Sequence, residues 1–211
     1  PQWRIMFQIH AVTNDQSSES IESLSEHIIA LSPFVDAIQI REKSRSPKSI
    51  AELIERISKH VDTAKLIIND RADIAIATGL SRVHLTEVSL SYLQLHKAFP
   101  NLTFGRSFHE LDDVVTHLND YDYGYIGHIF PTALKTYPPF GLAQLQSLAN
   151  ERKHGRLIAI GGIDETNITE VAPSVDGVAV MSGFFAKSIE ESITHACNLR
   201  SLALSAIAER K

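Results

Sequence analysis

Residues 157–163 read LIAIGGI, and residues 177–183 read GVAVMSG. Each stretch is a short apolar run bounded by glycine, which is typical of a strand covered on both faces of a parallel sheet. A helix-like segment separates the two stretches. In a (β/α)8 barrel the loops after the last two strands commonly bind phosphate, because glycine lets phosphate approach backbone N–H groups. The pair therefore indicates both a fold and a class of ligand.

Strand-like and helix-like periods alternate along all 211 residues. The predicted strands are Met6–Val12, Asp36–Ile40, Leu66–Asn69, Arg82–Leu85, Thr103–Arg106, Tyr123–Gly127, Arg156–Ile160 and Gly177–Met181. The helices predicted between them include Ser20–Leu31, Pro47–His60, Leu90–Phe99, Glu110–Leu118 and Leu142–Lys153. About eight such units without a linker predict an α/β protein, a single-domain (β/α)8 TIM barrel over residues 1–211. An open doubly wound sheet is the alternative, but no Gly-x-Gly-x-x-Gly follows the first strand.

Composition narrows the partners that we expect. The chain has 20 Lys and Arg against 25 Asp and Glu and no basic run, which argues against nucleic acid as a partner. No apolar stretch is long enough to span a bilayer and no secretory signal is present, so we expect no membrane partner and a cytoplasmic location. The single cysteine, Cys197, has no internal disulfide partner and is expected to be a small buried residue.

Polar residues cluster where the predicted strands end, which is where barrel enzymes place their active sites. The cationic side chains there suit an anionic ligand. The alternative is that Arg41 and Arg106 form structural ion pairs with Glu42 or Asp70. The strand-end residues that we expect at one common mouth include Arg41, Lys43, Asn69, Asp70, Arg106, Ser107 and His128.

The histidines fall into three groups. His84, His109 and His128 lie near strand ends, but their spacing matches no known ligand pattern, so no metal site is predicted. His10 alternates with core residues and is expected inside the barrel. The histidines in helical patterns, which are expected on the surface, are His27, His60, His96, His117, His154 and His195.

His128 stands where the sixth predicted strand meets its loop, ahead of Phe130-Pro131-Thr132. A neutral imidazole with a pKa of about 6.5 can take or give a proton at physiological pH. We therefore expect His128 to act in acid–base chemistry. The plain alternative is a histidine that is merely hydrogen-bonded at the rim of the barrel.

A series of motifs from the second strand to the eighth resembles the thiamin phosphate synthase superfamily of barrels. Any one of them is weak evidence, but together they occur in the right order and spacing. The motifs are QIREK at 39–43, INDRADIA at 68–75, VHL at 83–85, IGHIFPT at 126–132, AIGGI at 159–163 and GVAVMS at 177–182.

Departures from the synthase pattern point to one branch of this superfamily. The resemblance implies a Mg²⁺-binding Asp just after the fourth strand, where this chain has Ser89 in the run TEVS. Arg106 stands where the synthase usually has a small or apolar residue, and His128 replaces the proline of a Gly-Pro pair. With these features the chain is similar to TenI, the thiazole tautomerase branch.

That resemblance implies an isomerase in thiamin biosynthesis that uses neither metal nor cofactor. Its small-molecule substrate is the dihydro carboxythiazole phosphate, its product is the aromatic tautomer, and its catalytic histidine corresponds to His128. A homo-oligomer, dimer or larger, is expected by resemblance alone. The residues expected at the substrate are Arg41, Lys43, Asn69, Arg106, Ser107, Thr132, Lys135, Gly161, Gly162, Ser182 and Gly183.

The resemblance also suggests roles within that set and leaves two alternative functions open. Glycine and serine backbone groups after the last two strands would hold the phosphate, and Lys135 would neutralise an anionic group. Arg106 would bind the carboxylate or fill the space that a pyrimidine needs. The retained Arg41, Lys43, Asn69 and Asp70 resemble a diphosphate site, or they persist as a structural polar network. The alternatives are a thiamin phosphate synthase with an altered Mg²⁺ site and a non-catalytic, phosphate-binding regulatory protein.

Overall fold

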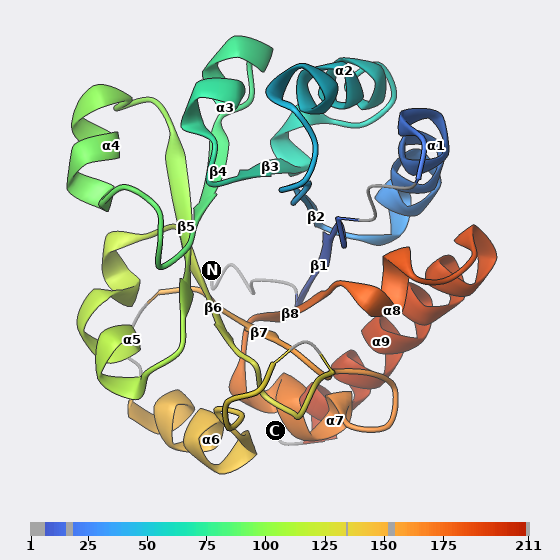
Figure 1. Ribbon diagram of the computed structural model, residues 1–211. Coiled ribbons are helices and arrows are strands. Elements are labelled where there is room, and N and C mark those ends of the chain that lie inside the picture. The colour runs from blue at the N-terminus through green and yellow to red at the C-terminus, as the bar shows by residue number, and fades with distance from the viewer. Residues whose placement is uncertain (1–6, 16–18, 134, 152–154, 210–211) are drawn as a thin grey trace, which may run out of the picture.

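The computed structural model describes residues 7–15, 19–133, 135–151 and 155–209. Its eight parallel strands form a closed barrel in which each strand pairs with the next and β8 pairs with β1. Figure 1 looks along the barrel, with the helices in a ring around the strands. The predicted (β/α)8 TIM barrel is therefore confirmed. The strands are β1 (Gln8–Val12), β2 (Ala37–Ile40), β3 (Leu66–Asn69), β4 (Arg82–Leu85), β5 (Thr103–Phe108), β6 (Tyr123–Gly127), β7 (Leu157–Ile160) and β8 (Gly177–Val180).

The helices begin close to where the sequence predicts them. Ser20, Ser46 and Ser91 cap α1, α2 and α4, because each side chain accepts a hydrogen bond from a backbone N–H three residues on. The predicted ends at Met6 and Lys153 lie outside the described residues. The helices are α1 (Ile21–Leu31), α2 (Pro47–Ile57), α3 (Ala72–Thr78), α4 (Tyr92–Ala98), α5 (Leu111–His117), α6 (Leu142–Glu151), α7 (Ile168–Val171), α8 (Ser182–Phe185) and α9 (Ile189–Glu209).

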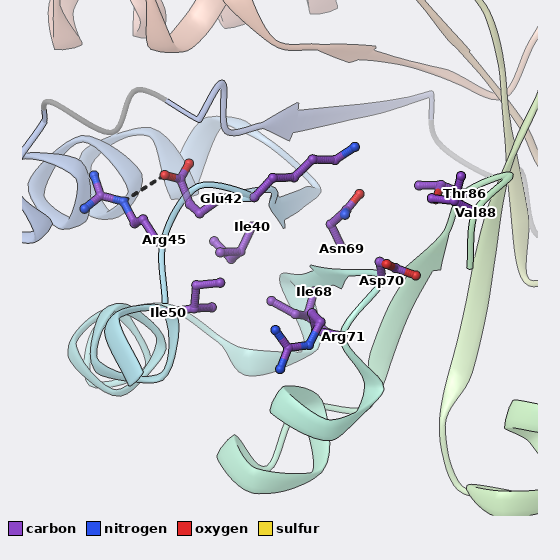
Figure 2. Close-up of a pocket in the computed structure, with 11 residues that line it drawn as sticks. Ile40, Glu42, Arg45, Ile50, Ile68, Asn69, Asp70, Arg71, Thr86 and Val88 are labelled. Carbon is purple, nitrogen blue, oxygen red and sulfur yellow. Dashed lines mark hydrogen bonds and ion pairs between the residues drawn. The ribbon is translucent and has the colours of Figure 1, made fainter. Parts of the chain in front are cut away.

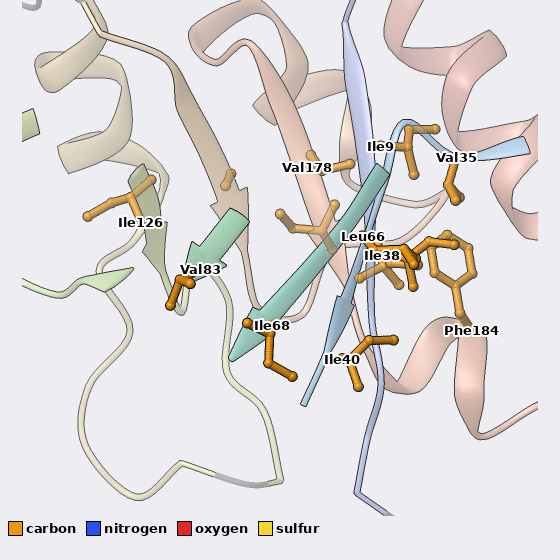
Figure 3. Close-up of a cluster of buried hydrophobic side chains, with 14 of the residues drawn as sticks. Ile9, Val35, Ile38, Ile40, Leu66, Ile68, Val83, Ile126, Val178 and Phe184 are labelled. Carbon is orange, nitrogen blue, oxygen red and sulfur yellow. The ribbon is translucent and has the colours of Figure 1, made fainter. Parts of the chain in front are cut away.

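Alternation along each strand builds two separate cores. Outward-facing side chains pack against the helices, and Figure 3 shows Ile38, Ile40 and Leu66 in this layer, with Phe184 of α8 beside them. A smaller cluster fills the barrel interior, as is usual for this fold. Its buried members are Val12, Ala37, Ile67, Tyr123, Tyr125, Ile158 and Ala179.

The interior also holds two neutral histidines. His10 Nδ1 lies 3.0 Å from the Tyr125 hydroxyl, which confirms its expected place inside the barrel. His84 Nδ1 lies 3.0 Å from the Tyr123 hydroxyl, and its Nε2 lies 2.9 Å from Ser107 Oγ. Burial lowers the pKa of His84 to about 3, so this ring is uncharged at neutral pH. Hydrogen bonds thus reach from the interior to Ser107 near the mouth.

Two histidines in helical patterns are not on the surface. His27 and His195 are buried, at 6% and 3% exposure, whereas His60, His96 and His117 are exposed as expected. His154 lies outside the described residues. Cys197, expected to be buried, is exposed on α9. Among the described residues, none of the helices is both long enough and apolar enough to cross a membrane.

Candidate active site

His128 follows β6 directly and lies at the carboxyl end of the barrel. It is only 5% exposed, and its ring packs in a T-shaped contact against Tyr137, with centroids 4.9 Å apart. The Ile129 N–H donates to the Ile160 carbonyl at 3.0 Å, and the Phe130 N–H donates to the Gly161 carbonyl at 3.1 Å. The loop that carries His128 is therefore held along the end of β7.

The loop that carries His128 approaches the two glycines after β7 so closely that it leaves no space for a side chain there. Gly161 and Gly162 have φ angles of +99° and +69°, which favour glycine. A Cβ on Gly161 would lie 2.3 Å from His128 Cβ, and one on Gly162 would lie 2.8 Å from Phe130 Cβ. The motif thus has a steric role that sequence reasoning missed, because the loop it meets is about thirty residues away in the chain.

The environment of His128 favours the neutral imidazole. Burial lowers the pKa of His128, and electrostatic interactions with Lys135 and His109 lower it further, against a smaller rise from a hydrogen bond with the Tyr137 backbone. A hydrogen bond that raises this pKa is one in which the ring donates to a carbonyl. Nδ1 is buried and has no hydrogen-bond partner within the described residues. The geometry therefore leaves Nδ1 able to accept a proton.

His109 lies beside His128, and sequence reasoning considered it only as a metal ligand. Its Nδ1–H donates to the carbonyl of Gly127 at 2.7 Å, and its Nε2 lies 3.8 Å from a carboxylate oxygen of Glu87. Its ring also faces Tyr137, with centroids 6.3 Å apart. In the sequence, the only sign that His109 would lie beside His128 was its position next to the end of β5.

Free backbone donors gather at the ends of β7 and β8. Over the described residues, no protein group accepts a hydrogen bond from the N–H groups of Gly162, Ser182 or Gly183. Barrels of this class bind phosphate in this region, with such N–H groups and a short extra helix after the last strand. The structure therefore brings the four predicted phosphate contacts, including Gly161, to neighbouring strand ends.

A pocket of about 280 Å³ lies on the opposite side of the mouth, at the ends of β2, β3 and β4. Figure 2 shows Asn69 and Asp70 at the end of β3, with Glu42 to one side and Thr86 to the other. Lys43 also lines this pocket. The Asn69 side chain accepts a hydrogen bond from Gln39 at 3.0 Å, as the alternative of a structural polar network predicts.

The donors in this pocket are poor for Mg²⁺. The Ser89 hydroxyl donates to the Asp70 carboxylate and accepts the Thr86 N–H at 2.7 Å. Glu42 is 3% exposed, and its carboxylate pairs with Arg45 at 2.9 Å. Mg²⁺ requires about six oxygen ligands, usually with one or two carboxylates. Among the described residues that line the pocket, Asp70 is the only carboxylate that is not already paired with a cation, so these residues do not fit a metal site that is held by the two carboxylates that the resemblance implies.

The structure corrects the expected position of Arg106. Because β5 continues to Phe108, Arg106 points outward with Phe104 and Phe108, away from the barrel interior. Its guanidinium forms two hydrogen bonds with Asp113 of α5, at 2.8 and 3.1 Å, and lies over the rings of Phe108 and Tyr121. Arg106 is therefore a structural residue of the helix layer, and its expected contact with substrate is wrong on this geometry.

The ion pairs expected between Arg41 or Arg106 and Glu42 or Asp70 are also not formed. Glu42 pairs with Arg45, and Asp70 accepts from Ser89, so neither binds Arg41 or Arg106. The Arg41 backbone N–H donates to Thr13 Oγ1 at 2.8 Å, and its side chain makes no ion pair with the described residues. Thr132 and Lys135 lie in the loop after β6, where the Lys135 ammonium is 5.2 Å from the centre of the Tyr137 ring.

Comparison with known proteins identifies the family. Residues 9–184 match the family described as thiamine monophosphate synthase. The thiamine-phosphate synthase of Chlorobium luteolum is 34% identical over 192 residues, which cover 87% of this chain and 89% of that protein. That of Shouchella clausii is 30% identical over 174 residues, covering 78% and 81%.

A solved structure supports the same family assignment. Thiamine phosphate pyrophosphorylase from Pyrococcus furiosus matches with a TM-score of 0.78 and 25% identity, over 97% of this chain and 98% of that one. These relatives carry the name of the synthase, so their names favour the alternative function over the tautomerase. With a family match over most of its length, this chain belongs to the thiamine monophosphate synthase family of thiamine-biosynthetic enzymes.

Proposed function

We propose that this protein is a metal-free and cofactor-free thiazole tautomerase, an isomerase that converts the dihydro carboxythiazole phosphate to its aromatic tautomer. The observation that carries the proposal is the position and state of His128. It is a buried imidazole with a lowered pKa, and its Nδ1 has no partner among the described residues. It also lies against the Gly161 turn, where the substrate phosphate would bind.

The proposed reaction moves one proton and needs no redox partner. The N–H groups of Gly162, Ser182 and Gly183 bind the phosphate and place the thiazole ring beside His128. Neutral His128 removes the ring proton next to the carboxylate, and the C–H bonding electrons move into the ring. The imidazolium then donates that proton to the exocyclic carbon, which makes the ring aromatic and restores neutral His128. Lys135 supplies a cation for the developing negative charge.

The proposal requires a movement of Tyr137. Nδ1 of His128 is buried, and the Tyr137 ring packs against the imidazole. Tyr137 itself is 43% exposed and belongs to the loop after β6. The substrate ring therefore has to displace Tyr137 from part of its contact with His128.

The second candidate is a thiamin phosphate synthase with an altered metal site. The names of the relatives favour it, and so does the pocket between β2 and β4, which retains Lys43, Asn69 and Asp70. It predicts condensation of a pyrimidine diphosphate with thiazole phosphate in the presence of Mg²⁺, and it predicts that His128→Ala is tolerated. A non-catalytic regulatory protein would bind the phosphate ligand without turnover.

The test follows aromatic thiazole formation from freshly made dihydro tautomer in EDTA. Wild-type protein should accelerate it, and His128→Ala should lose about a hundred- to ten-thousand-fold of that rate. His96→Ala, at an exposed histidine of α4, is the matched control and should keep full activity. A wild-type rate equal to the uncatalysed rate would refute the tautomerase. Adding Mg²⁺, pyrimidine diphosphate and thiazole phosphate then separates the synthase from the non-catalytic binder.

A further inference from the structure

A buried histidine that takes no part in the proposed chemistry lies behind the last two strand ends. His195 of α9 is 3% exposed, and its Nδ1 lies 2.6 Å from a carboxylate oxygen of Glu165. Because a carboxylate only accepts, the ring donates through Nδ1–H. Glu165 belongs to the loop between β7 and α7, three residues after Gly162. The pair therefore connects α9 to the glycine turn of β7.

The other nitrogen of this ring faces α8. A Cβ placed on Gly183 would lie 2.8 Å from His195 Nε2, so the imidazole occupies the space that a side chain at position 183 would need. The Phe184 ring packs against it with centroids 5.4 Å apart. Nε2 is buried and has no hydrogen-bond partner in the described part of the chain. An unpartnered buried nitrogen in a folded protein requires an explanation.

The same face of α9 holds α8 at a second point. Ser192, one turn before His195, donates its hydroxyl hydrogen to the Phe184 carbonyl at 2.6 Å and shares it with the Ser188 carbonyl at 2.8 Å. His27 Nε2 of α1 lies 3.0 Å from that hydroxyl. Two buried polar side chains of α9 thus set the position of α8. These contacts satisfy the hydrogen-bonding capacity of the Ser192 hydroxyl, whereas Nε2 of His195 has no hydrogen-bond partner among the described residues.

We propose that His195 is a positioning residue for a dianion, such as a phosphate monoester, bound between the ends of β7 and β8. It joins the glycine turn to α8, and it thereby fixes the positions of the N–H groups of Ser182 and Gly183. The inference rests on the phosphate end of the proposed function, which the tautomerase and the synthase share. His195 does not itself contact the anion.

The experiment titrates the full-length protein with sulfate by calorimetry. Sulfate stays a dianion from about pH 5 to about pH 8, whereas the second pKa of a phosphate monoester is about 6. In His195→Phe the sulfate affinity should be about two- to tenfold weaker than in wild-type protein, because the hydrogen bond that joins α9 to the glycine turn is lost.

Two further variants separate positioning from folding. His195→Gln keeps an N–H for Glu165, so it should retain most of the wild-type sulfate affinity. His96→Gln, on the exposed face of α4, should behave as wild type.

The outcomes distinguish this inference from the proposed function. Wild-type sulfate affinity in a folded His195→Phe protein would overturn the inference, and so would an equal loss in His195→Gln or wild-type protein that binds no sulfate. If sulfate binding weakens as expected in His195→Phe but the dihydro tautomer is not turned over by wild-type protein, the inference stands and the tautomerase proposal fails.

Discussion

The two sides of the barrel mouth differ in how completely their polar groups are arranged for a ligand. On the β6–β8 side, His128 fits against Gly161, and free N–H groups lie at neighbouring strand ends. On the β2–β4 side, Ser89 donates to Asp70, so the carboxylate has a neutral hydroxyl where a second carboxylate would help to hold a metal. The difference supports the proposed function, because the β6–β8 side presents free donors to an anion and the described residues of the β2–β4 side lack a second unpaired carboxylate for a metal.

The largest effect is expected from adding one methyl group on the β6–β8 side. Gly161→Ala places a Cβ 2.3 Å from His128 Cβ at a φ of +99°. Backbone strain and overpacking each cost about 1–3 kcal/mol, so unfolding by denaturant should show a loss of about 2–6 kcal/mol. Tautomerase activity should fall as well, because His128 is displaced.

Gly79→Ala is the matched control for this substitution. Gly79 has a φ of +73°, but a Cβ there would meet nothing within 4 Å. This substitution should lower the free energy of unfolding only by the backbone strain, about 1 kcal/mol, and should leave the activity unchanged. Equal stability losses in the two variants would contradict the close packing of His128 against Gly161.

The pH profile tests the state of His128. Burial is the main cause of its lowered pKa, with Lys135 and His109 adding to it. A base must be unprotonated, so kcat/KM should stay level as the pH falls through about 6.5 and drop about tenfold per pH unit only below the lowered pKa. Lys135→Gln removes a nearby charge and should move that drop to higher pH. An acid limb at or above pH 6.5 in the wild type would contradict a depressed pKa.

A substitution on the β2–β4 side is expected to create metal binding. Ser89→Asp places a carboxylate beside Asp70, which should destabilise the metal-free protein by about 1 kcal/mol through like-charge repulsion. Mg²⁺ should then raise the Tm of this variant, since a ligand that binds only the folded state stabilises it. Ser89→Asn has nearly the same size without the charge and should show no Mg²⁺ effect. Identical Mg²⁺ responses in both variants would show that position 89 does not decide metal binding.

Local patterns in the sequence were sufficient for the fold. Apolar runs such as Leu66–Asn69 and Tyr123–Gly127 have the same bounds in the structure as predicted, because a strand buried on both faces leaves a continuous hydrophobic signal. The helix predicted to begin at Pro47 likewise begins there in the structure, where Ser46 caps its first turn. Both signals depend only on neighbours in the chain.

The parts of the site that were missed depend on contacts between distant residues. His195 lies against Glu165 and Phe184, which are earlier in the chain, and its helical pattern alone resembles that of a surface residue. Gly161 follows β7 and contacts His128, which follows the neighbouring strand β6, and no local sequence pattern reveals this contact. Arg106 could have been placed correctly, since strict alternation from Phe104 puts it on the outer face once β5 is extended to Phe108.

The smallest effect is expected outside the mouth, at Arg106. Its side chain is 23% exposed, and its pair with Asp113 is bidentate but partly open to solvent, so Arg106→Gln should lower the free energy of unfolding by about 1 kcal/mol. Asp113→Asn should cost a similar amount, and the double variant should cost less than the sum, because both substitutions break the same interaction. The KM for the carboxythiazole phosphate should stay within about twofold of wild type, since a surface change of this kind leaves the site intact. A large rise in KM with unchanged stability would instead bring Arg106 back to the substrate and would mean that β5 rearranges when the ligand binds.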